Sequence, residues 1–171
     1  MRMIASTLTT DRLVLRHPQA SDLCAYTAYC VSTRTRFTGG AFNAVQAFDK
    51  FSAMIGHWAL RGFGRYVITR DGQPIGHVGP LQLDASEAPE MTWTLWDAAH
   101  EKQGFALEAA ETVRDHLLRD QGWDHLVIRI DPGNTASRRL AQKLGARFAD
   151  DPAPQWLPGA VTYWLMAEVP A

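Results

Sequence analysis

The segment at residues 100–106, His-Glu-Lys-Gln-Gly-Phe-Ala, constrains the fold of this chain most. It joins a strand-like run that ends near Trp96 to an amphipathic helix that begins near Phe105. The first amides of a helix have no intrahelical partners, and the helix dipole is positive at that end. A loop that leads directly into such a helix start is a typical anion-binding site. We therefore predict that the chain binds a ligand that carries phosphate.

A second strand, loop and helix follow further along the chain. Strand-like residues 126–131 lead through a short loop into a helix predicted over 135–144. Asn134 is a strong N-cap candidate, and Gly145 is a typical C-terminal stop. Because a helix connects strand 91–97 to strand 126–131, these two strands are expected to be parallel neighbours. Parallel neighbours that diverge at their carboxyl ends open a slot for a ligand.

The remaining elements are predicted from hydrophobic periodicity and turn residues. They are strands over 8–16, 65–70, 74–83, 146–149 and 161–168, and helices over 21–31, 44–60 and 105–120. Together they predict an α/β (α+β) fold with a central mixed sheet of about seven strands, flanked by about four helices, with the splayed parallel pair at its centre. We expect one domain that spans residues 1–171.

Composition argues against several classes of protein. A chain of 171 residues with 46% hydrophobic content suits one domain with a sizeable core. A net charge of −1 argues against a nucleic-acid partner. Residues 1–6 contain no apolar run of signal-peptide length, and no stretch of the chain is apolar enough to cross a membrane. We therefore expect a cytoplasmic protein without a membrane partner.

The cysteines and histidines indicate neither a disulfide nor a metal. Cys24 and Cys30 fall in one predicted helix with side chains in different directions, so free thiols are expected. The histidines lack metal-ligand spacing, so no metal site is expected. His77 alternates onto one face of its strand, where a histidine with satisfied hydrogen bonds in the core is more common than a catalyst.

At these residues the chain resembles the GNAT superfamily of acyl-CoA-dependent N-acetyltransferases, in particular the branch that acetylates N-terminal α-amines of ribosomal proteins. The family's pyrophosphate loop, Q/R-x-x-G-x-G/A, is similar to residues 101–106. Its N-x-x-S helix start and K-L-G helix end match residues 134–137 and 143–145, and its opening T-x-R-L-x-L-R strand matches residues 10–16. The resemblance covers nearly the whole chain, and the ordered motifs make it specific.

The resemblance implies acetyl-CoA as co-substrate and assigns residues to it. The diphosphate would lie on Glu101, Lys102, Gln103, Gly104, Phe105 and Ala106, the pantetheine arm along the strand backbone near Thr94 and Trp96, and the thioester near Asn134 and Ser137. Ser137 is the candidate that protonates the leaving thiolate. Glu90 is the candidate general base, because its offset from the loop is similar to that in histone-modifying relatives.

Each of these residues could instead have a purely structural role. Gly104 and Ala106 also suit close helix packing, Ser137 is also an ordinary first-turn serine, and Glu90 also reads as a solvated loop carboxylate. The chain departs from the family at two positions. Glu101 puts an acid beside a diphosphate, which is unfavourable by about 1 kcal/mol at a solvated surface, although Lys102 could offset it. Ala141 stands where many members have a tyrosine general acid.

The predicted reaction is direct attack of a primary amine on acetyl-CoA in a ternary complex. An α-amine with a pKa of about 7.8 is far more often neutral near pH 7 than a lysine with a pKa of about 10.4. Because the sequence offers no stronger base than Glu90, the expected acceptor is a peptide or protein N-terminal α-amine or a small-molecule amine. The alternatives are a non-catalytic acyl-CoA sensor, or an antibiotic or polyamine acetyltransferase, which an acidic cleft would support. The sequence is compatible with a monomer or a homodimer.

Overall fold

The computed structural model describes residues 4–168, which form an eight-stranded sheet in the order β1-β2-β3-β4-β5-β6-β8-β7. The strands are β1 (Thr7–Thr9), β2 (Val14–Arg16), β3 (Tyr66–Arg70), β4 (Gln73–Leu81), β5 (Glu90–Leu95), β6 (His125–Ile130), β7 (Arg147–Ala149) and β8 (Val161–Met166). Strands β5 and β6 are parallel, and the other neighbouring pairs are antiparallel. The predicted mixed sheet with a central parallel pair is confirmed.

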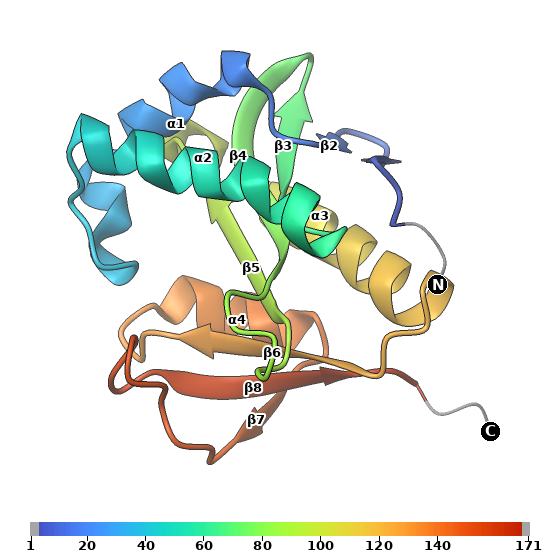
Figure 1. Ribbon diagram of the computed structural model, residues 1–171. Coiled ribbons are helices and arrows are strands. Elements are labelled where there is room, and N and C mark those ends of the chain that lie inside the picture. Colours follow the sequence, from blue (N-terminus) through green and yellow to red (C-terminus); the bar gives the residue numbers. More distant parts are fainter. Residues whose placement is uncertain (1–3, 169–171) are drawn as a thin grey trace.

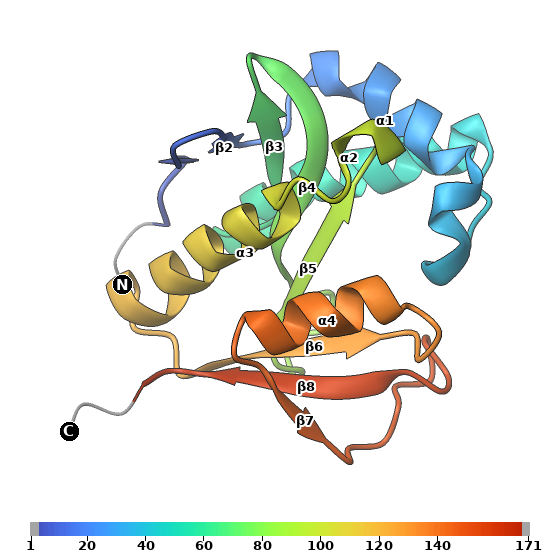
Figure 2. The same cartoon turned by 180° about the vertical axis from the view of Figure 1, so that it is seen from behind.

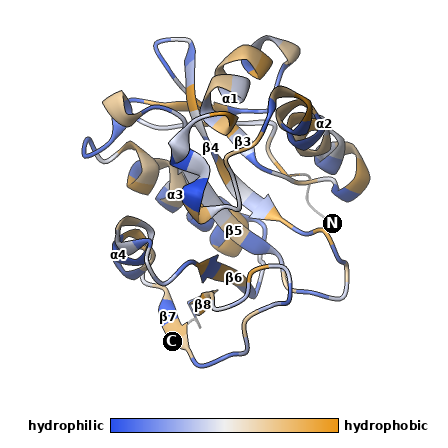
Figure 3. Cartoon of the chain, turned by 90° about the vertical axis from the view of Figure 1, so that its left-hand side faces the viewer, coloured by the Kyte–Doolittle hydropathy of each residue, from blue (hydrophilic) through white to orange (hydrophobic). Residues whose placement is uncertain are grey.

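Four α-helices flank the sheet. They are α1 (Leu23–Cys30), α2 (Ala44–Arg61), α3 (Phe105–Asp115), which continues as a π-helical turn over His116–Asp120, and α4 (Thr135–Lys143). Helices α1 and α2 lie on one side of the sheet, and α3 and α4 lie on the other (Figures 1 and 2). Apolar and polar segments alternate along α2 (Figure 3). The helix buries Phe51 and Met54 and leaves Phe48 exposed.

The predicted first strand, residues 8–16, is in fact two strands, which raises the strand number from about seven to eight. A turn separates them, in which the Thr10 amide donates to the Leu13 carbonyl at 2.9 Å. The Arg12 side chain reaches α3, where its Nε donates to the Glu108 carboxylate at 2.7 Å. These polar residues therefore bond to the start of α3 instead of continuing one strand.

Helix α1 begins later than the predicted start at residue 21. Residues 20–22 form a short 3-10 turn, and the α-helix starts at Leu23. Asp22 stands at the N-cap position of α1 but makes no side-chain cap hydrogen bond. It is 1% exposed, and its carboxylate instead accepts from the Gln19 amide and from the Arg16 guanidinium, each at 2.8 Å. The buried, bidentate pair with Arg16 ties this turn to the end of β2.

Strands β5 and β6 separate almost as soon as they pair. Their ladder contains the single register pair Glu90 and Val127. The other edge of β5 is paired with β4 along its whole length, from Glu90 to Leu95. Beyond the fork, β5 and β6 diverge (Figure 2), so the inner edge of β5 keeps hydrogen-bonding groups that β6 does not use.

Other expectations concern the cysteines and the membrane. Cys24 is exposed and Cys30 is buried, and both are free thiols as predicted. None of the helices in the described range is long and apolar enough to cross a bilayer. The prediction that residues 1–6 do not form a signal peptide falls partly on residues 1–3, which lie outside the described residues.

Candidate active site

The fork between β5 and β6 opens into a cleft of about 800 Å³, a size that suits a bound ligand. Its walls come from α1, the 3-10 turn η2 (Thr33–Phe37), α2, strands β4 to β6, the starts of α3 and α4, and the connecting loops. Residues far apart in the sequence therefore meet in one open cavity at the carboxyl end of the parallel pair.

Gly104 begins α3 in a conformation that favours glycine. It is the N-cap with φ +82°, and no side chain caps the helix. The first amide of α3 with a helical partner is that of Glu108, which donates to the Gly104 carbonyl at 3.0 Å. Main-chain amides of residues 105–107 are thus available for a ligand, and Ala106 lines the cleft. This arrangement fits a diphosphate at the cleft end.

Several predicted loop residues do not direct their side chains into the cleft. Phe105 is 1% exposed in the core, with Arg12 and Arg70 at 4.6 and 4.8 Å from its ring centroid. The Gln103 side chain instead donates to the Ala99 carbonyl at 2.7 Å. The rotation of α3 turns Phe105 into the core, so a contact of Phe105 with the diphosphate would use its main-chain amide. The loop residues that line the cleft are Glu101, Lys102 and Ala106.

Glu101, the unusual acid of the loop, is paired. Its carboxylate accepts from Arg34 Nη2 at 2.7 Å, and the same nitrogen donates to the Leu95 carbonyl at 2.9 Å. Arg34 Nε is buried and has no hydrogen-bond partner within residues 4–168. The arginine thus offsets the negative charge that the sequence places beside the diphosphate.

We expect Glu101→Gln to strengthen coenzyme A binding about fivefold, because removing an acid about one Debye length or less from the phosphates is worth about 1 kcal/mol. The substitution also frees Arg34 for a phosphate oxygen. Calorimetric titration with coenzyme A at low salt measures the change. Asp150→Asn, which removes an exposed charge outside the cleft lining, is the control. A dissociation constant that is unchanged or higher in Glu101→Gln contradicts this account.

Thr94 lines the cleft as expected, but Trp96 does not. Strand β5 ends at Leu95, and the Trp96 ring is 5% exposed, with its Nε1 donating to His77 Nδ1 at 2.9 Å. The alternation of side chains along the chain turns Trp96 toward Tyr26 of α1, with ring centroids 5.4 Å apart. Burial lowers the pKa of His77 well below its usual value, so this histidine is a neutral core group.

The start of α4 supplies the opposite wall. Asn134 is the N-cap, and its Oδ1 accepts from the Ser137 amide at 3.2 Å, as the sequence predicts. Both residues line the cleft. Ala141 is fully buried in the core and does not line it. Ser137 is therefore the hydroxyl that α4 presents to the cleft.

Replacing Asn134 with alanine is expected to remove the cap and to destabilise the fold by about 1 kcal/mol, which lowers Tm by about 2–4 °C in a chain of this size. Asn134→Asp keeps an acceptor for the Ser137 amide but loses the side-chain N–H donors. We expect Asn134→Asp to keep the wild-type Tm and to bind coenzyme A several-fold more weakly. If Asn134→Asp binds coenzyme A as tightly as the wild type, Asn134 acts only as the helix cap and does not bind the ligand.

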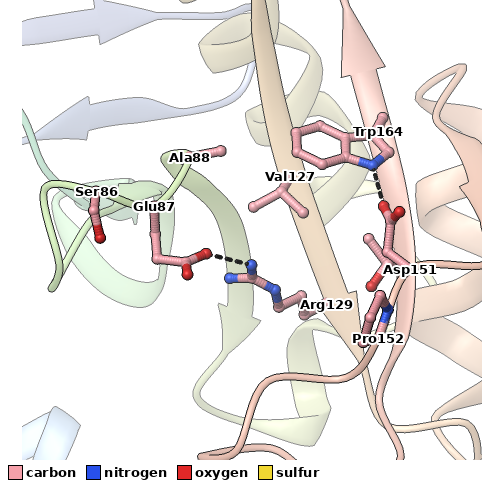
Figure 4. A pocket seen from close by; sticks show the side chains of 9 residues that line it. Ser86, Glu87, Ala88, Val127, Arg129, Asp151, Pro152 and Trp164 are labelled. Atoms are coloured by element: carbon pink, nitrogen blue, oxygen red, sulfur yellow. Dashed lines mark hydrogen bonds and ion pairs between the residues drawn. The ribbon is translucent and has the colours of Figure 1, made fainter.

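Glu90 lies inside β5 at the fork, not in the loop before it. It is 8% exposed, so the alternative of a solvated loop carboxylate is wrong. Burial raises the pKa of Glu90 to about 7, against the opposing effect of Arg129. Arg129 Nη1 lies 3.4 Å from the Glu90 carboxylate, while its Nη2 donates to Glu87 at 3.0 Å (Figure 4). A cleft-lining carboxyl group that titrates near neutrality is suited to proton transfer.

Sequence reasoning did not identify several residues that line the cleft. Tyr26 and Tyr29 come from α1, Arg34 from η2 and Arg65 from the residue before β3. The tyrosines share one helical face and resemble ordinary core positions. The sequence feature that could have indicated such a residue is Arg65, a charged residue directly before an apolar strand.

The model of the Acetyltransferase (GNAT) domain matches residues 12–147 of this chain. The chain belongs to the GNAT acetyltransferase family. The protein is therefore an acyltransferase, and the predicted family and fold are confirmed.

Solved structures share this fold, and one curated protein is similar in sequence to part of the chain. An acetyltransferase from Agrobacterium tumefaciens str. C58 is 29% identical, with a TM-score of 0.85 over 96% of both chains. RimL, a ribosomal L7/L12 alpha-N-protein acetyltransferase in complex with coenzyme A, shares the fold at 15% identity, with a TM-score of 0.75 over 96% of this GNAT chain and 98% of its own. YkkB of Bacillus subtilis (strain 168), an uncharacterized protein, is 30% identical over 82 residues, so the match spans 47% of each chain.

Proposed function

We propose that this GNAT protein transfers an acetyl group from acetyl-CoA to a primary amine, either a peptide or protein N-terminal α-amine or a small-molecule amine, by direct attack in a ternary complex. The observation that carries the proposal is the forked cleft, with free helix amides at its α3 wall and the buried Glu90 carboxyl group at the fork. Main-chain amides of residues 105–107 would hold the diphosphate. The unpaired inner edge of β5 around Thr94 would hold the pantetheine amides.

Glu90 would take the proton that the attacking ammonium must lose. Its pKa of about 7 lies close to the value of about 7.8 of a free α-amine, so proton transfer between them is nearly balanced. The amine nitrogen then bonds to the acetyl carbon as the carbon–sulfur bond breaks. The nitrogen loses its second proton as the amide forms, and Ser137 would pass a proton to the leaving thiolate while regaining one from the nitrogen. A thiol pKa of about 8.5 makes the thiolate a good leaving group even with weak assistance.

Because the thiolate leaves readily, we expect Ser137→Ala to lower kcat only about tenfold, less than the usual effect of losing a general acid. The Ser137 amide that Asn134 caps is retained, so Tm is expected to stay unchanged. Thr135→Ala, on the exposed side of the same helical turn, is the matched control. An unchanged kcat would leave Ser137 with a structural role only.

The charges of the cleft do not favour a polycationic acceptor such as a polyamine. The lining carries six cationic side chains against three carboxylates: Arg34, Arg36, Lys50, Arg65, Lys102 and Arg129 against Glu90, Glu101 and Asp131. A polyamine would meet more repulsion than attraction there. The expected support for that alternative, a strongly acidic cleft, is missing from the described lining.

Thiol release tests the proposed activity. The protein is incubated with acetyl-CoA and a panel of amino acids, peptides and small amines, and free coenzyme A is followed with a thiol reagent. Release that depends on at least one amine supports the proposal. Coenzyme A binding by calorimetry, without release from any acceptor, would contradict it and favour the acyl-CoA sensor.

A further inference from the structure

Arg65 is a cation in the cleft without an anionic partner. It directly precedes β3 and lines the cavity. Within residues 4–168, no carboxylate lies at ion-pair distance from its guanidinium group, and no hydrogen bond engages that group. Arg34 and Arg129, by contrast, are paired with acids. Arg65 is therefore free to bind a ligand.

The groups around Arg65 are neutral hydrogen-bonding side chains. Burial raises the pKa values of Tyr26 and Tyr29, so both phenols keep their protons. Burial also lowers the pKa values of His57 and His77, and Arg65 lowers them further. His57 is fully engaged, with Nδ1 at 2.7 Å from the Phe63 carbonyl and Nε2 accepting from the Gln82 amide at 3.0 Å. None of these groups neutralises the guanidinium charge.

Glu90 is the acid whose charge acts on Arg65, and its carboxylate is already paired with Arg129. The charge of Arg65 favours the ionised form of Glu90, and Glu90 favours the charged form of Arg65. Both residues line the cleft. A partly desolvated guanidinium group without a close anion is unfavourable by itself. A ligand that brings its own anion removes that penalty.

Two further cations extend this positive region to the rim. Arg36 of η2 lies over the Phe37 ring at 4.6 Å, and Lys50 of α2 lies over the Phe42 ring at 4.2 Å. Both line the cleft, and neither has a carboxylate partner within the described chain. The positive potential would concentrate anionic ligands at this end of the cleft.

We propose that the acceptor amine carries an anionic group, a carboxylate or a phosphate, a few bonds from its nitrogen, and that Arg65 binds this group while Glu90 faces the amine. This inference rests on the proposed acetyl transfer and narrows its substrate class. The planar guanidinium group can engage two oxygens of a carboxylate or phosphate at once, and the Tyr26 and Tyr29 phenols add neutral donors. Arg65 would hold the acceptor, so its loss should act on KM more than on kcat.

Paired acceptors test this proposal and separate the sources of the anion. The pairs are α-amino acids against their amides, O-phosphoethanolamine against ethanolamine, and alanyl-aspartate against alanyl-asparagine. We expect the anionic member of at least one pair to have a kcat/KM at least tenfold higher, after correction for the fraction of neutral amine. The pair that shows the preference identifies the anion as an α-carboxylate, a phosphate or a peptide side chain.

Arg65→Gln is expected to raise KM for the preferred anionic acceptor by about 10- to 100-fold and to leave its neutral partner nearly unchanged. Arg65→Lys, which keeps the charge but loses the planar fork, should recover part of the preference. Arg139→Gln, an exposed position outside the cleft, removes the same charge as a control. Coenzyme A affinity and Tm verify the fold of each variant. If Arg65→Gln fails to fold, the change of KM in Arg65→Lys tests the role of Arg65.

The outcomes are distinguishable. Acetylation of neutral and anionic partners at equal rates, with Arg65→Gln affecting both alike, would overturn the role of Arg65 and leave acetyl transfer standing. Absence of thiol release with every amine would instead overturn the proposed function. High salt should weaken the anionic preference in the wild type and have little effect in Arg65→Gln.

Discussion

Replacing Glu90 with glutamine is expected to lower kcat by at least about 100-fold, the lower end of the range for losing a general base. The amide has nearly the same shape as the carboxyl group but cannot take a proton from the ammonium. Glu87→Gln is the matched control, because Glu87 also pairs with Arg129 but is exposed. Steady-state thiol release with a saturating amine measures the effect. A loss of less than about threefold in Glu90→Gln would remove Glu90 from the mechanism.

The pH dependence of kcat gives a second readout of the same substitution. Because the base must be ionised, wild-type kcat is expected to fall as the pH drops through about 7, the pKa to which burial raises Glu90. In Glu90→Gln, kcat should no longer fall as the pH drops through about 7. Only the titration of the amine substrate should remain, and it appears in kcat/KM. An identical profile in both proteins would contradict the assignment.

The same raised pKa makes Glu90 unfavourable for stability above neutral pH. Its folded-state pKa of about 7 exceeds the ordinary 4.5, so the folded chain holds the proton more tightly between these values. Stability is therefore highest below about pH 4.5 as far as this group is concerned, and it declines as pH rises to about 7. The difference corresponds to about 3 kcal/mol. We expect Glu90→Gln to resist urea better than the wild type near pH 8, with the gap closing near pH 4.5.

Introducing an acid into the first turn of α3 should disrupt coenzyme A binding. Ala106→Glu places a carboxylate beside the free amides of that turn, where it fills the space for the diphosphate and repels its charge. We expect the dissociation constant for coenzyme A to rise at least 100-fold, equivalent to about 3 kcal/mol. Tm should not fall, because an acid in the first turn interacts favourably with the helix dipole.

Ala99→Glu is the matched control for this substitution. It introduces the same side chain at an exposed position of the preceding 3-10 turn, outside the cleft lining. Calorimetric titration compares the two variants and the wild type. A dissociation constant within about threefold of the wild type in Ala106→Glu would show that the diphosphate does not bind at the start of α3.

The sequence by itself determined the features that depend on local backbone chemistry. The loop over residues 100–106 indicated a helix that begins near Phe105, and Asn134 indicated the cap of α4. The helix between strands β5 and β6 indicated that the two strands are parallel. Each of these follows from the conformational and hydrogen-bonding preferences of residues close together in the chain.

Only the tertiary structure decided which side chains face the cleft and how they are charged. The rotation of α3 buries Phe105 and exposes Ala106, and the fork of the sheet buries Glu90 and raises its pKa. Arg34 and Arg65 reach the cavity from segments that no sequence motif connects to it. The physical reason is that burial and electrostatic effects depend on neighbours in space, which chain segments far apart supply only after the sheet has formed.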